Sequence, residues 1–379
     1  LVHLCASSML ITYRAPGADS ILSGTNVPRF TKVVHHLHET LLSFATVRAV
    51  QSSFVRSFIM LNVPGQRIGD SWFYVTEGLV HCYFLTEPES REHSGGRFGW
   101  DIGHSVSSNL VDWDYQGLAL KRGSLGSFDS QSCATGSLLS RGGHFWMAYS
   151  GLREDEDPLE RKVFRVGIAF SDDLYNWIKF DGNPVTEADG TLYELIGSGV
   201  REYGHWRDPF LIDQGTKVIQ LVTARRFHDE ISKRGTIAVA SSEDMLSWKL
   251  ESPIEVDPVA EELEVPQIYR IGELYYLKFC TIPSLLLPEF TVRFPGHNFR
   301  RSDYSMVGVS QMGPFHIHGT GEVVNPGVPE VPYAGQLVPW KGEWFLLGTV
   351  AAVDGKHGDY VGDPMHISAD ETGIHVFAE

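Results

Sequence analysis

One aromatic-rich segment, preceded by a glycine, occurs five times along this chain of 379 residues. A glycine before an apolar run is typical of a tight turn that opens a β-strand, because glycine adopts backbone angles that other residues avoid. The intervals between copies are 65, 72, 57 and 70 residues, which indicates a repeated structural unit. The glycines are Gly78, Gly143, Gly215, Gly272 and Gly342, and they precede LVHCYFL, HFWMAYS, TKVIQLVTA, ELYYLKF and EWFLLGT.

A second motif repeats in step with the first. Residues 107–113 (SSNLVDW), 171–177 (SDDLYNW) and 242–248 (SEDMLSW) each follow an alternating or apolar segment. We interpret each copy as the end of a strand, a turn with Asn or Asp, and a Trp that opens the next strand. Four short strands per unit, repeated five times, predict an all-β chain that folds as a five-bladed β-propeller. A β-sandwich would not explain the period, and a helical solenoid would need a 3.6-residue pattern that these units lack.

The repeats begin after residue 60, so we expect two parts. Residues 61–379 would form the propeller, and residues 1–60 an irregular or partly helical N-terminal extension that could pack on it. Within the extension, residues 34–50 (VHHLHETLLSFATVRAV) fit an amphipathic helix. We interpret the histidines of this segment as ordinary helix or loop residues rather than metal ligands, because no carboxylate lies at a suitable spacing. These histidines are His35, His36 and His38.

Two further segments interrupt the repeats. Residues 154–162 (EDEDPLERK) form a charge run, which is typical of a solvated loop. Residues 283–302 (PSLLLPEFTVRFPGHNFRRS) break the period and are expected to form an insertion over one face.

The composition argues against some classes of binding partner. The formal net charge is −16, which disfavours a nucleic-acid partner because phosphate binding needs clustered Lys and Arg. No run of 18 apolar residues occurs, so we expect no membrane partner. The opening run LVHLCASSMLITY lacks a basic leader and a clear cleavage site, and the compartment stays open between cytoplasmic and secreted. The sequence indicates no cofactor, and it does not give an oligomeric state.

The cysteines support the same interpretation. Cys5, Cys82, Cys133 and Cys280 have no CxxC spacing, so a zinc or redox motif is not expected. In a chain of this length, four such cysteines are better explained as buried free thiols than as a disulfide framework.

Three acidic residues share one position in the repeat. Asp70, Asp208 and Glu264 lie eight, seven and eight residues before their turn glycines, and the other two copies carry Thr135 and Ala334 there. Equivalent positions of successive blades surround the propeller axis, so three carboxylates would meet in one funnel. Their mutual repulsion costs stability unless their pKa values shift or a ligand binds. Glycoside hydrolysis needs such a group, because one carboxylate must be ionised while another holds a proton for the leaving oxygen.

Residues near the three acids complete the predicted sugar site. Asp208 lies between Arg207 and Pro209, and Arg207 could hold the acid or a sugar hydroxyl. Gly69 before Asp70 would allow close approach of the backbone to a ligand. His104 is assigned to the pocket wall, with a core position as the alternative. We expect substrate contacts from Trp72, Trp100 and Trp206 as stacking platforms, for which a core position is again the alternative, and from Thr135 and Gln336.

Residues 68–85 and 101–120 resemble the β-fructofuranosidase superfamily, most closely glycoside hydrolase family 32. Residues 207–209 (RDP) and 264–266 (EVP) are similar to the RDP and Glu-Cys-Pro motifs of that family, in the same order. Residues 134–137 (ATGS) fall where the family has a Ser-Gly-Ser-like element. The chain departs from the family at residues 69–72 (GDSW), where Asn-Asp-Pro-Asn is usual, and at Val265, where cysteine is usual.

This resemblance implies a retaining hydrolase of terminal β-fructofuranosyl linkages, acting on a small-molecule or oligosaccharide substrate. Asp70 would be the nucleophile, Glu264 the general acid/base and Asp208 the stabiliser of the transition state. Retention would require the carboxyl groups of Asp70 and Glu264 to lie roughly 5–5.5 Å apart. Three alternatives stay open: an inverting arabinan- or xylan-type enzyme of glycoside hydrolase family 43, the next closest resemblance; a glycan-binding propeller without catalysis; and a protein-interaction propeller.

Overall fold

The computed structural model describes residues 61–90, 99–157, 159–196, 204–227, 230–323, 332–350 and 360–377. All of them belong to one compact unit, Phe58–Glu379. The predicted extension at 1–60, with its helix at 34–50 and its histidines, lies outside the described residues.

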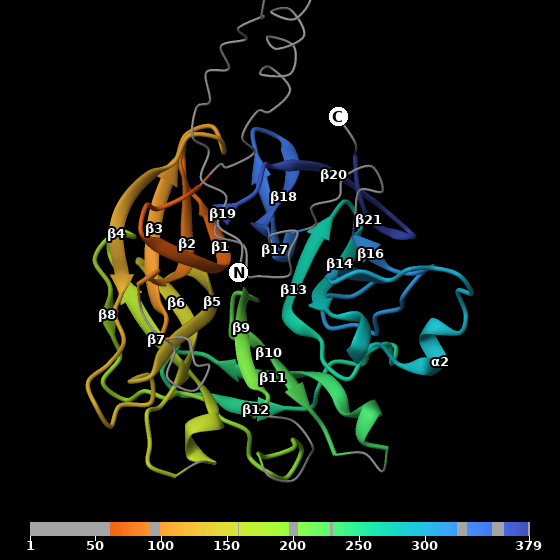
Figure 1. The fold of residues 1–379 in the computed structure, drawn as a ribbon, viewed down its shortest axis with the longest axis horizontal. Coiled ribbons are helices and arrows are strands. Elements are labelled where there is room, and N and C mark those ends of the chain that lie inside the picture. Colours follow the sequence, from red (N-terminus) through yellow and green to blue (C-terminus); the bar gives the residue numbers. More distant parts are fainter. Residues whose placement is uncertain are drawn as a thin grey trace, which may run out of the picture. The chain divides into compact units, whose positions relative to one another are not determined.

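Five small antiparallel sheets form a five-bladed β-propeller, as the repeats predict (Figure 1). The first blade contains β1 (Gln66–Val75), β2 (Val80–Pro88), β3 (Asp101–Ser107) and β4 (Asp114–Leu120). The second contains β5 (Ser132–Arg141), β6 (His144–Leu152), β7 (Phe164–Ser171) and β8 (Ile178–Lys179). The third contains β9 (Trp206–Asp213), β10 (Val218–Arg225), β11 (Gly235–Ser242) and β12 (Lys249–Glu251). The fourth contains β13 (Glu264–Ile271), β14 (Leu274–Thr281), β15 (Ser302–Gly308) and β16 (Glu322–Val323). The fifth contains β17 (Pro332–Trp340), β18 (Glu343–Val350), β19 (Tyr360–Val361), β20 (Met365–Asp370) and β21 (Gly373–Val376).

The five repeated glycines have the role that the sequence predicts. Each lies in the hairpin turn between the first two strands of a blade, with φ between 62° and 88°. These backbone angles are strained for residues with a Cβ atom, so glycine is the favoured residue there. The five copies therefore mark five equivalent hairpins.

The Ser-to-Trp motif also forms the same turn in each copy. In the second copy, Asp173 Oδ1 accepts hydrogen bonds from the backbone nitrogens of Tyr175 and Asn176, both at 2.8 Å. Leu174 adopts a left-handed φ of 68° and is buried, so apolar burial offsets the backbone strain. The equivalent left-handed residues of the other copies are Leu110 and Met245.

The first strands of the blades form the inner ring. β1, β5, β9, β13 and β17 surround the centre of the view in Figure 1, and each contacts the first strand of the next blade. The ring closes between β17 and β1, where the side-chain oxygen of Gln336 accepts a hydrogen bond from the Phe73 nitrogen at 2.5 Å. Apolar side chains between neighbouring blades make up the core. The inner ends of five different blades therefore meet in one small region.

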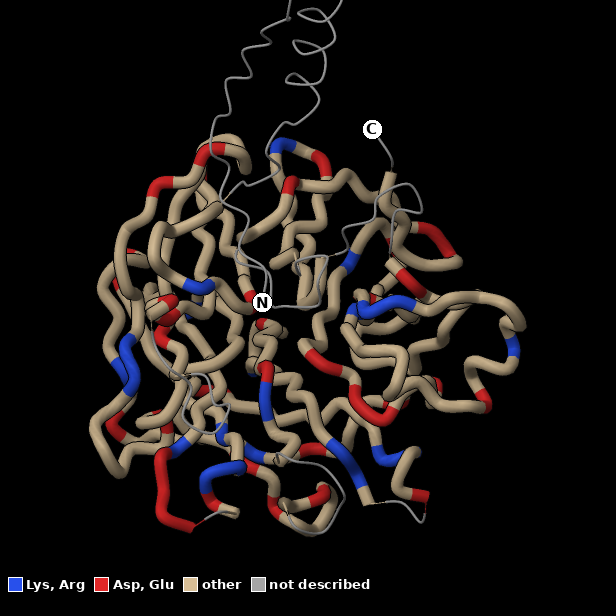
Figure 2. The backbone as a smooth tube through the Cα atoms, in the orientation of Figure 1, with Lys and Arg blue, Asp and Glu red and all other residues tan. Residues whose placement is uncertain are grey.

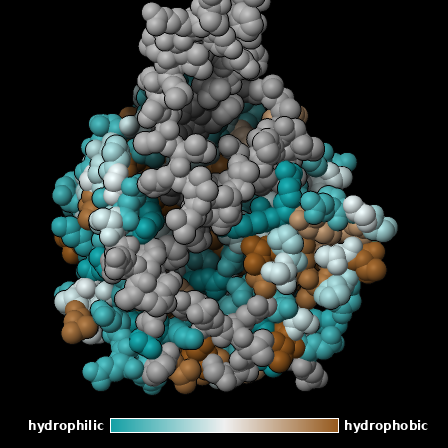
Figure 3. Space-filling view, viewed as in Figure 1, coloured by the Kyte–Doolittle hydropathy of each residue, from teal (hydrophilic) through white to brown (hydrophobic). Residues whose placement is uncertain are grey.

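The two interrupting segments lie in loops between strands. The insertion joins β14 to β15 and contains the short helices η3 (Pro283–Leu285) and α2 (Pro288–Thr291). Hydrophobic side chains gather over this blade, on the right of Figure 3, and Val292 is 75% exposed there. The charge run leads into η1 (Glu160–Lys162), and a further 3-10 helix, η2 (Ile231–Arg234), precedes β11.

Further predictions concern the cysteines, the charged residues and membrane-spanning segments. Cys82, Cys133 and Cys280 are buried free thiols, as predicted, and Cys5 lies outside the described residues. Lys, Arg, Asp and Glu are interspersed along the blades (Figure 2). Among the helices of the described chain, none has the length and apolar character needed to cross a membrane.

Candidate active site

Each inner strand is irregular near its start, and these irregularities carry the site. A β-bulge places an extra residue in one strand of a pair and turns its side chains in new directions. In β1, Gly69 and Asp70 together face one residue of β2. The equivalent residues are Thr135 in β5, Asp208 and Pro209 in β9, Val265 and Pro266 in β13, and Ala334 and Gly335 in β17.

The shared position predicted from the glycine count is correct to within one residue. Asp70 and Asp208 lie inside their bulges, whereas Glu264 is the last paired residue before its bulge. Asp208 and Val265 adopt left-handed backbone angles, with φ of 60° and 50°. Counting residues cannot reveal such a shift, because it depends on how each bulge is formed.

Arg207 connects the acids of the third and fourth blades. Its Nη2 atom donates to Glu264 Oε1 at 2.5 Å and to Glu262 Oε2 at 2.8 Å. Its Nε atom lies 3.5 Å from Asp208 Oδ2. One guanidinium group therefore balances three carboxylates, and a planar fork is well suited to this.

Asp208 has a strongly shifted pKa. Burial and the charges of Glu264 and Asp70 together raise its pKa to about 7, against the opposing charge of Arg207. Its Oδ2 atom accepts hydrogen bonds from Thr223 Oγ1 at 3.1 Å and from the Val265 nitrogen at 3.3 Å. These electrostatic effects require Asp70, Asp208 and Glu264 to lie close together, so the structure brings the three predicted carboxylates into one cluster.

Donors from neighbouring blades hold the other two carboxylates. Thr135 Oγ1 donates to Asp70 Oδ2 at 2.5 Å, so Thr135 supports Asp70. The hydroxyl of Tyr333 donates to Glu264 Oε2. The guanidinium of Arg301 lies 3.5 Å from the centre of the Tyr333 ring, a cation–π contact. Glu264 thus accepts from Arg207 and Tyr333 on its two different oxygens.

A narrow cavity adjoins the cluster. Asp208, Val265 and other residues line it, and all five inner strands contribute. Trp72 is one of them, but its ring stacks on Tyr83 at 6.4 Å, so that face is covered. The remaining lining residues include Thr135, Pro209, Pro266, Gln267 and Gln336, so Thr135 and Gln336 lie beside the acid cluster.

The prediction that Trp206 stacks on sugar is wrong. Trp206 is 1% exposed and packs edge-on against Tyr193 at 5.1 Å. Its Nε1 atom donates to Thr186 Oγ1 at 3.1 Å. The ring fills the core between the second and third blades and presents no face to a ligand. Trp100 is also a core residue, packed with Leu85 and Phe128, and its ring edge lies beside Gly69.

The assignment of His104 to the pocket wall is wrong as well. His104 is buried in β3, between the rings of Tyr83 at 4.6 Å and His81 at 5.1 Å. His81 Nδ1 and His104 Nε2 share a hydrogen bond of 3.0 Å. Burial lowers the pKa of His104 to about 3, so it is a neutral core histidine. The alternating pattern around it could not tell which strand of the blade it occupies.

The reason for Gly69 also differs from the prediction. A Cβ atom at this position would lie 2.9 Å from the Leu85 Cβ, which cannot rotate away. Gly69 is therefore required by packing against β2 rather than by the approach of a ligand.

Several residues of the site are not among those predicted from the sequence. Glu262 lies two residues before Glu264 and could have been noticed as a second acid on that segment. Tyr333 and Arg301 come from distant segments, and only the closed propeller brings them to Glu264.

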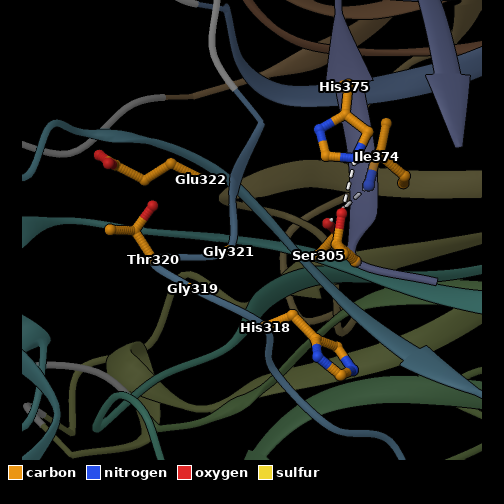
Figure 4. A pocket seen from close by; sticks show the side chains of 9 residues that line it. Ser305, His318, Gly319, Thr320, Gly321, Glu322, Ile374 and His375 are labelled. Carbon is orange, nitrogen blue, oxygen red and sulfur yellow. Dashed lines mark hydrogen bonds between the residues drawn. The ribbon is translucent and has the colours of Figure 1, made fainter. Parts of the chain in front are cut away.

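A larger cavity lies outside the acid cluster. It has a volume of about 510 Å³ and lies between the outer part of the fourth blade and β21 (Figure 4). Ser305, His318 and His375 line it, and Ser305 Oγ accepts a hydrogen bond from the Ile374 nitrogen at 3.1 Å. None of the three clustered acids lines it, so size alone does not locate the site.

Comparison with protein families adds independent evidence. Residues 71–325 match the model of the glycosyl hydrolases family 32 N-terminal domain. Sucrose-6-phosphate hydrolase of Pediococcus pentosaceus is 27% identical over 223 residues, which cover 58% of this chain and 39% of that protein. Extracellular exo-inulinase of Aspergillus awamori is 24% identical over 201 residues, covering 46% of this chain and 33% of that protein. The matches therefore span about two fifths or less of these relatives.

Solved structures support the same fold. Inulosucrase from Halalkalicoccus jeotgali bound to kestose superposes with a TM-score of 0.66 at 18% identity, covering 84% of this chain and 90% of that chain. The GH32 beta-fructofuranosidase of Bombyx mori gives a TM-score of 0.60 at 19% identity, covering 85% of this chain and 65% of that chain. At this level of identity the likeness concerns the propeller itself.

Proposed function

The chain belongs to glycosyl hydrolase family 32, and we propose that it cleaves terminal β-fructofuranosyl linkages with retention of configuration. The observation that carries the proposal is the cluster of Asp70, Asp208 and Glu264, each on a different blade and each in a different environment. The relatives support the sugar class, because they are named as hydrolases of sucrose-6-phosphate and inulin. The expected substrate is a sucrose-type molecule or a fructan oligosaccharide.

In the first step, the Asp70 carboxylate attacks the anomeric carbon of the fructosyl unit. The bond to the glycosidic oxygen breaks, and Glu264 gives that oxygen its proton. Thr135 holds one oxygen of Asp70 at 2.5 Å, which fixes the direction of attack. The product of this step is a fructosyl ester of Asp70 and a free leaving group.

In the second step, Glu264 removes a proton from water. The resulting oxygen attacks the anomeric carbon, the ester bond to Asp70 breaks, and fructose leaves. Arg207 and Tyr333 bind different oxygens of Glu264 and keep the carboxyl group in one orientation through both steps. Two displacements at one carbon restore its original configuration.

Asp208 has a separate role. It accepts hydrogen bonds from sugar hydroxyls and stabilises the positive charge that develops on the ring. Its pKa of about 7 reflects burial beside two other acids. A positively charged transition state lowers the pKa of Asp208 again, because it favours the ionised carboxylate.

Product analysis tests the proposal. The purified protein is incubated with sucrose, inulin, levan, arabinan and xylan, and the first anomer released is identified by NMR. Fructose released initially as the β-anomer is expected. Release of arabinose or xylose with inverted configuration would instead support an enzyme of the family 43 type.

The variant Asp70→Asn tests the role of Asp70 as the nucleophile. It should keep the fold and reduce turnover by on the order of 10⁴ or more, because the nucleophile is lost. Unchanged turnover would reject Asp70 as the nucleophile. A wild-type protein that binds fructans without any turnover would show a glycan-binding propeller.

A further inference from the structure

The fifth blade has Ala334 at the bulge position where the first and third blades carry an acid. We infer that this blade holds both catalytic carboxylates through one pair of facing residues, and that Thr349 is the positioning residue for Asp70. This inference rests on the proposed function, since it assumes that Asp70 and Glu264 are the nucleophile and the acid/base.

Thr349 reaches the bulge that carries Asp70 from the neighbouring blade. Its Oγ1 atom donates to the Gly69 carbonyl oxygen at 2.5 Å and lies 3.4 Å from Ser71 Oγ. Thr349 and Ser71 are buried, with 7% and 2% exposure, so water competes little for these contacts. A bulge interrupts the ladder of backbone hydrogen bonds, and Thr349 supplies a donor to it from outside the sheet.

Asp70 is therefore fixed from both sides. The second blade provides Thr135, which holds the Asp70 carboxylate at 2.5 Å. The fifth blade provides Thr349, which holds the backbone immediately before Asp70. Two anchors on adjacent residues of the chain restrict both the position and the rotation of the nucleophile.

The same pair of facing residues also reaches the acid/base. Tyr333 lies directly opposite Thr349 in the β17–β18 ladder, on the last regular pair before the β17 bulge. Its hydroxyl donates to Glu264 Oε2. Thr349 also pairs with Val361 of β19, so β18 is held on both sides at this point.

This arrangement links the two supports to the spacing that the reaction needs. A retaining enzyme needs its two carboxyl groups roughly 5–5.5 Å apart. Tyr333 and Thr349 are a facing pair in one β-ladder. Their contacts with Glu264 and with the bulge that carries Asp70 are therefore fixed relative to each other, which helps to keep that separation.

The experiment compares Thr349→Val, which removes the hydroxyl at nearly constant volume, with Thr349→Ser, which keeps it. We expect kcat for sucrose or inulin to fall about 10- to 100-fold in Thr349→Val with KM within about twofold, because a small displacement of a reacting group is costly. Thr349→Ser should stay within about threefold of the wild type. Equal kcat values for Thr349→Val and the wild type would overturn the inference.

Thr186→Val is the matched control. Thr186 is equally buried, at 6%, and donates to Gln220 Oε1 at 2.7 Å, but it does not contact the acid cluster. It should lose stability without any loss of kcat per folded molecule. If Thr349→Val does not fold, the comparison is made between Thr349→Ser and Thr349→Ala, and equal kcat values in those two would overturn the inference.

A second substrate distinguishes the role of Thr349 from the role of Tyr333. A β-fructofuranosyl fluoride has a leaving group that needs little protonation, so it depends on the nucleophile more than on the acid. Thr349→Val should slow this substrate as much as sucrose, whereas Tyr333→Phe should slow sucrose more. A Thr349→Val defect that disappears with the fluoride would show that Thr349 does not position Asp70.

The failure of this inference is distinguishable from the failure of the proposed function. A wild-type protein without fructosidase turnover, or an Asp70→Asn variant with normal turnover, would reject the function itself. An active wild type with a normal Thr349→Val variant would reject only the positioning role.

Discussion

Arg207 and Glu264 are joined by a contact of 2.5 Å between Nη2 and Oε1. The same guanidinium lies 3.5 Å from Asp208 through its Nε atom. Arg207 lowers the pKa of Asp208, which burial and the neighbouring acids raise to about 7. The ionisation of Asp208 therefore depends on Arg207.

We predict that Arg207→Gln raises the pKa of Asp208 by at least about one further unit, because an opposite charge at this distance is removed. A pH titration followed by ¹³C NMR of labelled aspartate carboxyl groups measures this, with Asp208→Asn to assign the signal. Arg207→Lys keeps the charge and should give a smaller shift. An unchanged titration in Arg207→Gln would show that burial alone sets the pKa.

A second prediction concerns the buried pair of histidines. The pKa of His104 is about 3 in the folded protein because of burial, next to His81 and with Asp173 opposing the shift. In the unfolded chain it is about 6.5. The folded state thus binds fewer protons between these values, and the stability that neutral His104 contributes is complete above pH 6.5 and is lost as the pH falls.

We expect wild-type stability to decline relative to His104→Phe by up to about 1 kcal/mol per pH unit between pH 6 and pH 4. Denaturant unfolding of both proteins across this range measures it. The comparison with His104→Phe is needed because Asp208 changes stability with pH in the opposite direction. Its raised pKa makes the free energy of unfolding fall as the pH rises from about 4 to 7. That contribution is common to both proteins and cancels in the difference.

A third prediction tests the corrected position of Trp206. The ring fills the core and donates to Thr186, so Trp206→Ala should cost about 3–5 kcal/mol of unfolding free energy and Trp206→Phe less. KM for the sugar should stay within about twofold in the Phe variant, measured below its unfolding temperature. A large rise in KM at unchanged stability would instead restore the stacking role.

The repeated elements of the fold could be predicted from sequence because each has a local cause. Gly78 and its four counterparts occupy turns that need left-handed backbone angles, and Asp173 closes its turn with its own side chain. Such requirements leave a turn glycine in all five blades and the Ser-to-Trp motif in three of them. The number of blades follows from counting the glycines.

The residues that the sequence could not place depend on contacts between blades. Tyr333 reaches Glu264 across 69 positions of sequence, and Thr349 reaches Gly69 across 280. His104 and Trp206 share composition and alternation with true pocket residues, and only the stacking of neighbouring blades buries them. Sequence patterns within a blade contain no information on these neighbours.

The bulge of β1 gives the last prediction. Gly69 is packed so closely against β2 that a Cβ atom would lie 2.9 Å from the Leu85 Cβ. Gly69→Ala must therefore displace the bulge, and Asp70 moves with it. We expect a loss of about 1–3 kcal/mol of stability from overpacking, together with a fall in kcat of about 10-fold or more per folded molecule.

Gly103→Ala is the matched control for this variant. A Cβ atom at Gly103 would lie 2.6 Å from the Phe84 ring, in the same blade but on β3. It should destabilise the protein by a similar mechanism while leaving kcat per folded molecule unchanged. Thermal unfolding and steady-state kinetics on both variants separate the two effects. Equal kcat losses in both would mean that overpacking anywhere in the first blade disturbs Asp70, and that the bulge has no special role in holding it.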